Sequence, residues 1–405
     1  MQFSAHPNRF FFKLLSYRLF IVLAYQMIAV VVGWHIYELT HDTLALGLIG
    51  LAEVIPYFSF ALFAGYAVDH HSRRLFGVLA SLMVFLSALT LTAVASGLIT
   101  GNALWWLYSA IAFNGVARAF ISPSYSSMFA IILPRKEYAR ASSLGSSVFQ
   151  LALVVGPALG GVLVGLAGKT AGYGVASLLS LGAAAVLLSL RVKEPPPAES
   201  AAIFTSIASG LRFVFGNQVI LGAQSLDMFA VLFGGAVSML PAFIHDVFHY
   251  GPEGLGFLRA APAAGAVITG LFLARHPINL HAGRWLLGAV AGFGLCIIAF
   301  ALSQNIWIAS MLLVLSGICD GVSVVMRTTI MQLVTPDPMR GRVSAINGIF
   351  IGSSNELGAF ESGIAARLMG LVPSVIFGGV MTLAVVAATT KLAPKLRRLE
   401  LHQLY

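Results

Sequence analysis

The sequence predicts an all-α membrane protein of twelve transmembrane helices, arranged as two pseudo-symmetric six-helix bundles. Composition, a series of long apolar runs and an internal repeat lead to this prediction. Of the 405 residues, 58% are hydrophobic and only 10% are charged, and the mean hydropathy is +0.89. A soluble domain carries about 25% charged residues. Polar groups could therefore not cover the apolar surface of this chain in water.

The N-terminal half contains six apolar runs, each near or above the roughly 20 residues that a bilayer-spanning helix needs. Length defines these runs better than periodicity does, because lipid-facing and protein-facing sides are both apolar. Short polar connections separate the runs, and two of these connections are basic, around Arg73 and around Arg140. We predict helices at 18–39, 44–68, 75–98, 104–132, 142–168 and 173–190.

The C-terminal half shows the same organisation. Its basic connections lie around Arg275 and Arg342, and Gly and Ala are frequent in the apolar runs. Small residues let helix backbones approach closely in lipid. We predict helices at 218–247, 254–274, 284–303, 305–334, 342–367 and 371–390.

Lys and Arg are distributed unevenly between the connections. Most of the 24 basic residues lie near the two termini and in alternate connections, whereas the other connections offer only Lys169 and, at a helix end, Arg367. Cytoplasmic loops carry the excess of Lys and Arg, so we predict that both termini are cytoplasmic. Anionic inner-leaflet lipid accounts for the net charge of +9 without a nucleic-acid partner.

The longest cytoplasmic connection divides the chain. It begins after residue 190, and the prolines 195–197 end the sixth helix and form a stiff spacer. The stretch that follows has helical spacing and predicts either an amphipathic surface helix or an ordinary linker. We predict an N-terminal bundle at 1–190, a linker at 191–217, a C-terminal bundle at 218–391 and a cytoplasmic tail at 392–405.

An internal repeat supports this division. At a constant offset of 202 residues, six identities connect the two halves over a helix, a basic loop and the next helix. Repeated six-helix halves are typical of secondary transporters, whose site lies between the halves near the bilayer midplane. The identities are Gly115 with Gly317, Pro134 with Pro336, Arg140 with Arg342, Ser142 with Ser344, Gly156 with Gly358 and Gly161 with Gly363.

The connection after the second predicted helix carries a motif that resembles the major facilitator superfamily. The stretch 65–74 reads GYAVDHHSRR, similar to the family signature of Gly, three residues, Asp, a basic residue, any residue, Gly and two basic residues. It departs from that signature at His70 and Ser72. The resemblance implies that a group of residues locks the cytoplasmic helix ends; positive-inside topology alone is the alternative. The group is Gly65, Asp69, Arg73, Arg74 and Arg140.

A second motif, GPALGG at 156–161, resembles the one associated with antiporters and exporters in this superfamily. Pro157 frees a backbone carbonyl, while Gly156, Gly160 and Gly161 permit tight packing, so the helix can bend. An ordinary tight helix crossing is the alternative.

Within the superfamily, the chain is similar to the branch that contains the bacterial enterobactin exporter and related drug exporters. The similarity rests on AFISP at 119–123, LRAAP at 258–262 and, most specifically, SSNELGAFESG at 353–363. It implies a protein of the bacterial inner membrane that exports a small amphipathic metabolite or drug, driven by protons. We expect this protein to be monomeric.

Eight charged residues fall inside the predicted helices. Charges at membrane depth cost a few kcal/mol each on insertion scales, so they are candidates for function. Those on the fourth, seventh and tenth helices line the central cavity in the family that the chain resembles. The eight are Glu53, Arg118, Asp227, Arg259, Asp320, Arg327, Glu356 and Glu361.

The repeat relates some of these charges to one another. Asp320 is equivalent to Arg118, so the two could meet across the cavity, bind a substrate there, or simply neutralise each other. Arg327 lies seven residues after Asp320 on the same helical face and is equivalent to Tyr125. We predict that Arg118, Arg327, Tyr125, Glu361 and Asn355 contribute to a cavity for an anionic or catechol-like oxygen.

Proton coupling requires a carboxyl group near a cation. We rank Asp227 first for this role, followed by Asp320, Glu356 and Glu53. Each of them could instead form a helix–helix hydrogen bond. Glu356 and Glu361 are five residues apart, which on a helix separates their directions, so we do not expect one paired site.

The main prediction is a proton-coupled exporter that works by alternating access, without cofactor or metal. A lipid or lysophospholipid transporter of the same superfamily and a membrane sensor that does not transport are the alternatives. We do not predict an enzyme, because the sequence contains no nucleophile–base constellation, phosphate loop or metal motif.

Overall fold

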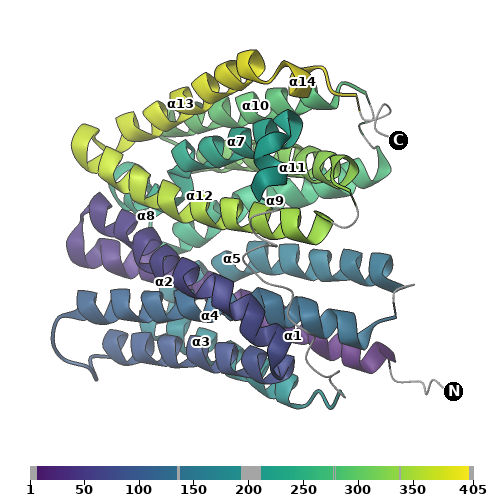
Figure 1. Ribbon diagram of the computed structural model, residues 1–405. Helices are drawn as coiled ribbons and strands as arrows, with labels where there is room; N and C mark the ends of the chain where they lie inside the picture. Colours follow the sequence, from purple (N-terminus) through teal and green to yellow (C-terminus); the bar gives the residue numbers. More distant parts are fainter. Residues whose placement is uncertain are drawn as a thin grey trace, which may run out of the picture. The chain divides into compact units, whose positions relative to one another are not determined.

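The computed structural model describes residues 7–134, 137–192, 211–276, 278, 280–336 and 339–400, and over these residues the ordered elements are helices (Figure 1). The chain forms two compact units. Unit 1 comprises Met1–Thr40, Ala52–Glu199 and Tyr250–Ala260. Unit 2 comprises His41–Leu51, Ser200–His249 and Ala261–Tyr405. Two helices therefore begin in one unit and continue in the other.

Unit 1 is built around a long first helix. Helix α1 packs along α5, and α3 packs against both α4 and α5 (Figure 1). Within α5, Gly168 has φ 80° and ψ 172° and separates two helical segments, where the sequence predicts a break between 168 and 173. A positive φ of this kind favours glycine. The helices are α1 Pro7–Thr40, α2 Thr43–His70, α3 Arg73–Ala95, α4 Ala103–Ile132 and α5 Tyr138–Leu188.

In unit 2, α10 packs against α11 and α13, while α7 packs against α12 and α13. The last short helix, α14, inserts the fully buried Leu396 against α7 and α10. The elements are α7 Gln218–Phe233, η2 Gly235–Met239, α8 Leu240–Ala242, η3 Phe243–Phe248, α9 Pro252–Arg275, α10 Ala282–Leu302, α11 Ile306–Val334, α12 Arg340–Met369, α13 Leu371–Leu392 and α14 Pro394–Arg397.

The continuous helix predicted at 218–247 is interrupted in the structure. Helix α7 ends at Phe233, and a 3₁₀ segment, a short α-helical turn and a π-helical segment follow it. Gly234 packs against the ring of Phe293, and a Cβ at Gly234 would lie 2.9 Å from Cζ of that ring. Pro241 lacks the N–H that a continuous helix requires. The interruption therefore follows from a glycine contact and a proline inside one apolar run.

Nine helices within the described residues are long and apolar enough to cross a membrane. One of them, Leu144–Leu188, has 45 residues, which is enough for two crossings. The chain is therefore an all-α membrane protein, as predicted. The predicted division at 1–190, 191–217, 218–391 and 392–405 stays a prediction, and residues 193–210 of the linker lie outside the described residues.

The repeated glycines lie at equivalent helix crossings. Gly115 of α4 lies against the backbone of Glu53 in α2, and Gly317 of α11 lies against the backbone of Pro262 in α9. Gly161 of α5 meets Gly256 of α9, just as Gly363 of α12 meets Gly47 of α2. Each contact lies within one unit. The repeat thus records positions at which only a hydrogen atom fits between two backbones.

Candidate functional site

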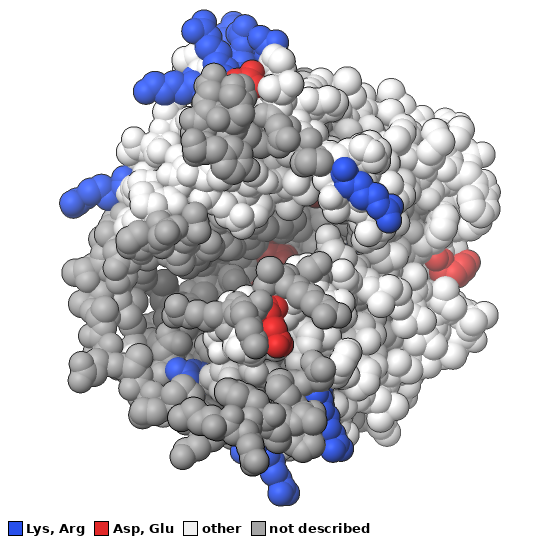
Figure 2. Space-filling view, turned by 90° about the vertical axis from the view of Figure 1, so that its right-hand side faces the viewer, with Lys and Arg blue, Asp and Glu red and all other residues white. Residues whose placement is uncertain are grey.

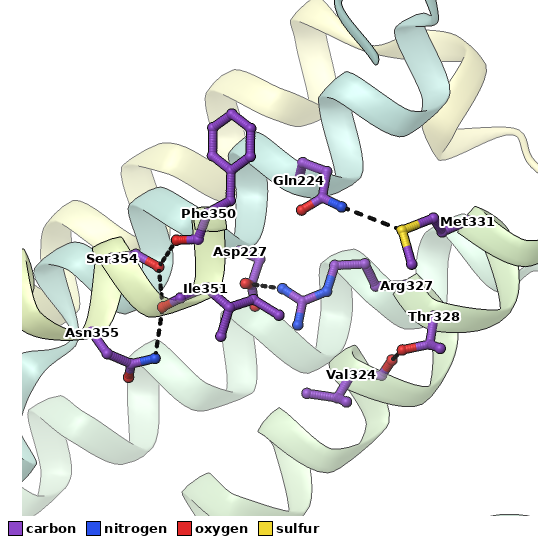
Figure 3. Close-up of polar contacts among 10 residues, drawn as sticks. All are labelled: Gln224, Asp227, Val324, Arg327, Thr328, Met331, Phe350, Ile351, Ser354 and Asn355. Carbon is purple, nitrogen blue, oxygen red and sulfur yellow. Dashed lines mark hydrogen bonds and ion pairs between the residues drawn. The ribbon is translucent and has the colours of Figure 1, made fainter. Parts of the chain in front are cut away.

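The most deeply buried ion pair among the described residues joins α7 to α11 in unit 2. Asp227 of α7 and Arg327 of α11 point toward each other and form a direct contact between Oδ2 and Nη1 (Figure 3). Their side chains are 8% and 5% exposed. Charges at such depth are mostly paired with an opposite charge or with backbone groups. The two charges predicted to contribute to coupling and to substrate binding therefore form one site.

Neighbouring side chains extend this site along the same two helices. Gln224, about one turn before Asp227, donates from Nε2 to Sδ of Met331 at 3.6 Å (Figure 3). Met331 lies one turn after Arg327. Gln224 is 3% exposed. This contact joins α7 to α11 beside the ion pair.

Helix α12 packs on α7 and carries the segment that the sequence singles out at 353–363. Ser354 is buried and donates to the carbonyl oxygen of Phe350 at 2.8 Å. Asn355 is exposed and donates from Nδ2 to the carbonyl oxygen of Ile351 at 2.9 Å (Figure 3). Both side chains therefore bond within their own helix.

Unit 1 contains a second ion pair at membrane depth. Arg118 of α4 contacts Glu53 of α2 directly, and the side chains are 33% and 13% exposed. The guanidinium carbon of Arg118 also lies 5.4 Å from the centroid of the Tyr25 ring of α1, within cation–π range. The predicted cavity residue Arg118 and the predicted coupling residue Glu53 are thus brought together.

The predicted cavity residue Tyr125 lies in an aromatic and basic group of unit 1. The guanidinium carbon of Arg18 lies 4.2 Å from the Tyr125 ring centroid and 5.0 Å from that of Phe149. A Cβ at Gly145 would lie 2.7 Å from the Tyr125 hydroxyl oxygen, so a glycine makes room for that hydroxyl.

The other predicted charges occupy half-buried positions. Asp320 lies on α11, and Glu356 and Glu361 lie on α12. Arg259 of α9 donates to the carbonyl oxygen of Ala29 in α1 at 3.5 Å.

The motif at 65–74 forms the turn from α2 to α3. Ser72, which stands where the family signature has Gly, accepts a hydrogen bond from the Leu75 N–H at 3.3 Å and caps α3. Arg74 donates to the carbonyl oxygen of Leu190 at 2.7 Å and ties this turn to the end of α5. Gly65 lies in α2, where a Cβ would meet no atom within 4 Å. The side chains of Asp69 and Arg140 lie outside the described residues.

The GPALGG motif lies where α5 crosses two other helices. A Cβ at Gly156 would lie 2.8 Å from Cβ of Gln26, and one at Gly160 would lie 3.3 Å from Cα of Met27, both in α1. Gly161 meets Gly256 of α9. Pro157 lies inside the helix beside them. The structure therefore shows the tight crossing that was one of the two interpretations of this motif.

The model of the Major Facilitator Superfamily matches residues 14–359 of this chain. The chain belongs to the major facilitator superfamily. As a member, it has the predicted twelve-helix fold and is a transporter rather than an enzyme. It is a multi-pass protein of the inner membrane.

The curated relatives include the enterobactin exporter EntS of Escherichia coli O1:K1, which is 26% identical over 264 residues. EntS of Shigella boydii serotype 18 is 27% identical over the same length. Each match covers 63% of this chain and 63% of the relative. The branch predicted within the superfamily is thereby confirmed.

Solved structures of other transporters show the same fold. A POT family transporter in complex with 5-aminolevulinic acid superposes with a TM-score of 0.76 at 11% identity, over 98% of both chains. A bacterial homologue of the human lysosomal transporter Spinster gives 0.70 at 16% identity, over 98% of this chain and 97% of that one.

Three residues of the two ion-pair regions were not singled out from the sequence, although signals for them exist. Gln224 lies three residues before Asp227, on the same face of a helix. Tyr25 is the equivalent of Asp227 at the repeat offset of 202. Arg18 lies seven residues before Tyr25, again on one face of the helix. The repeat thus places Tyr25 and Tyr125 where unit 2 has Asp227 and Arg327.

Removal of one partner from the unit 1 ion pair gives the first prediction. Glu53→Gln leaves Arg118 without its carboxylate, and we expect the free energy of unfolding to fall by about 1–3 kcal/mol. Thermal unfolding of the purified protein in detergent measures this change. The double variant Glu53→Gln/Arg118→Gln should recover much of the loss. A double variant no more stable than Glu53→Gln would contradict the pairing.

Proposed function

We propose that this transporter exports a small amphipathic compound in exchange for protons by alternating access. The observation that carries the proposal is the buried Asp227–Arg327 pair. It combines a carboxylate that can accept a proton with a guanidinium that can hold an oxygen atom, at membrane depth in a transporter. Intramembrane carboxylates of this kind are typical of proton relays.

The chemistry of the pair supports exchange rather than cotransport. When Asp227 is ionised, the pair offers an acceptor beside a donor, which matches a substrate that has adjacent hydroxyl groups. One hydroxyl donates to the carboxylate, and the other oxygen accepts from Arg327. A proton on Asp227 removes the charge of the acceptor and weakens this contact. Substrate and proton therefore compete for the same carboxylate, as an antiporter requires.

The burial of the pair supports alternating access. With side chains 8% and 5% exposed, neither charge is open to a substrate in the described conformation. A change of conformation has to open a path to the site. In this proposal, α5 bends at its glycine crossings with α1 and α9. The cytoplasmic helix ends are locked together by the group Asp69, Arg73, Arg74 and Arg140.

The similarity to enterobactin exporters supports a siderophore-like compound as the first substrate to test, and a drug-like compound as the second. For either substrate, we propose that both termini of the chain lie in the cytoplasm, as the distribution of Lys and Arg predicts.

Transport by purified protein in liposomes tests the proposal. We expect a pH gradient to drive uphill movement of radiolabelled enterobactin or of ethidium, with protons moving in the opposite direction. The variant Asp227→Asn/Arg327→Gln removes both charges together, so that no buried charge is left unpaired. It should lose uphill transport by more than tenfold, because the proton site is gone.

The matched control is Glu38→Gln/Lys169→Gln, which removes an exposed ion pair in which Nζ and Oε2 are 2.6 Å apart. This variant should transport as the wild type does. Full uphill transport by the Asp227→Asn/Arg327→Gln variant would exclude the pair as the coupling site. Binding of both compounds without any flux in wild-type protein would favour a sensor.

A further inference from the structure

A groove lies on unit 2 between α10 and α11. Its volume is about 660 Å³, and it is lined mainly by apolar side chains and by Gly288. Both helices are long and apolar enough to cross the membrane. A Cβ at Gly288 would meet no atom within 4 Å, which leaves open space beside this residue in the groove. The lining residues are His281, Arg284, Trp285, Gly288, Ala289, Ile318, Cys319 and Val322.

One end of the groove is polar. Arg284 and Trp285 belong to the first turn of α10 and are both exposed. Trp is enriched at the level of lipid headgroups, where its ring is half in water. The groove therefore runs from an exposed guanidinium at the end of a spanning helix to apolar side chains deeper in the span, such as Ile318 and Val322. A phospholipid has the same order of groups, with an anionic phosphate at the membrane surface and apolar acyl chains deeper in the bilayer.

The C-terminal segment adds positive charge at the polar end. Backbone N–H of Gly283 donates to the carbonyl oxygen of Leu399 at 3.4 Å, so this segment lies against the start of α10. Glu400 accepts from the N–H of His281 at 2.9 Å and balances that histidine. Exposed basic residues gather around α14, and Figure 2 shows such a cluster at the top of the view. They are Lys391, Lys395, Arg397 and Arg398.

From this placement we infer that the α10–α11 groove binds an anionic phospholipid of the surrounding bilayer. Arg284 holds the phosphate, the basic residues around α14 favour a negatively charged headgroup, and one acyl chain fills the space beside Gly288. Exposed Lys and Arg near a membrane surface each contribute about 1 kcal/mol to binding of anionic lipid. The inference does not depend on the proposed transport activity.

Two variants separate this site from general lipid contact. Arg284→Gln removes the phosphate partner, and Gly288→Phe fills the groove. Gly270→Phe is the matched control, because Gly270 is exposed on α9, and a Cβ there also meets no atom within 4 Å. Native mass spectrometry of the purified full chain counts bound phosphatidylglycerol and phosphatidylcholine.

We expect phosphatidylglycerol to bind the wild type in preference to phosphatidylcholine. Binding of phosphatidylglycerol should be about tenfold weaker in Arg284→Gln, because one charge-assisted contact is lost. We expect a loss of similar size in Gly288→Phe and no change in Gly270→Phe. Equal binding of both lipids, an equal loss in Gly270→Phe, or unchanged binding in Gly288→Phe overturns the site. Displacement of phosphatidylglycerol by enterobactin or ethidium would assign the groove to a transported compound and also overturn it.

Discussion

Asp227→Ala should lower the free energy of unfolding of this transporter by about 3–5 kcal/mol, the cost of breaking a buried ion pair by removing one partner. The remaining guanidinium of Arg327 is only 5% exposed, so bulk water is poorly placed to replace the lost carboxylate. Unfolding of the purified protein in detergent, followed against temperature or denaturant, measures the loss. Arg327→Ala leaves a buried carboxylate and should cause a loss of similar size.

The double variant Asp227→Leu/Arg327→Met distinguishes the cost of an unpaired charge from damage to packing. Replacing a buried ion pair by apolar residues of similar volume is often neutral or stabilising. We therefore expect this variant to be at least as stable as the wild type. A double variant as unstable as either single variant would contradict the pairing and indicate that the two side chains act separately.

An exposed ion pair provides the control for the size of the effect. Glu38 and Lys169 are paired at 2.6 Å, but their side chains are 49% and 26% exposed. Exposed pairs typically contribute less than about 1 kcal/mol. Glu38→Ala should therefore change stability little. A loss as large as that of Asp227→Ala would show that burial does not set the cost.

The sequence predicts the membrane spans well because one physical quantity, the length of an apolar run, determines them. It predicts less well what happens inside a run. The break after Phe233 depends on a contact between Gly234 and Phe293, which lie far apart in the sequence. The sequence predicts a break between residues 168 and 173. In the structure the break is a single residue, Gly168, because glycine can adopt φ 80°.

The residues of the site can be predicted individually, but their partners cannot. Asp227, Arg327, Glu53 and Arg118 stand out because charge is rare in apolar spans. Which carboxylate meets which guanidinium depends on how α7 lies against α11 and α2 against α4. Apolar spans carry almost no periodicity to fix such rotations. The pairs Asp227–Arg327 and Glu53–Arg118 therefore emerge only from the structure.

The repeated glycines lead to the second large effect, at the crossing of α11 with α9. A Cβ at Gly317 would lie 2.6 Å from the carbonyl carbon and 2.7 Å from Cα of Pro262. These are backbone atoms, so no side-chain rotation relieves the clash, and the helices must separate. We expect Gly317→Leu to lower the free energy of unfolding by about 1–3 kcal/mol or more, as overpacking does.

The equivalent change in unit 1, Gly115→Leu, tests whether the two repeated glycines contribute equally to stability. A Cβ at Gly115 would lie 3.2 Å from the carbonyl carbon and 3.3 Å from Cα of Glu53, and it would also overlap the Glu53 carbonyl oxygen. We expect Gly115→Leu to cost about as much as Gly317→Leu. It should also disturb the Arg118–Glu53 pair, because the displaced backbone belongs to Glu53.

Gly270→Leu is the control for both glycine variants, because it adds the same side chain where a Cβ meets no atom within 4 Å. Thermal unfolding in detergent compares the three. If Gly115→Leu and Gly317→Leu are as stable as Gly270→Leu, the helices can move apart at these crossings without loss of stability. If only one of these two glycine variants is destabilised, the two halves share the glycine in sequence but not its contribution to stability. Equal losses at both crossings would mean that each half keeps a glycine for the same physical reason, the approach of two backbones.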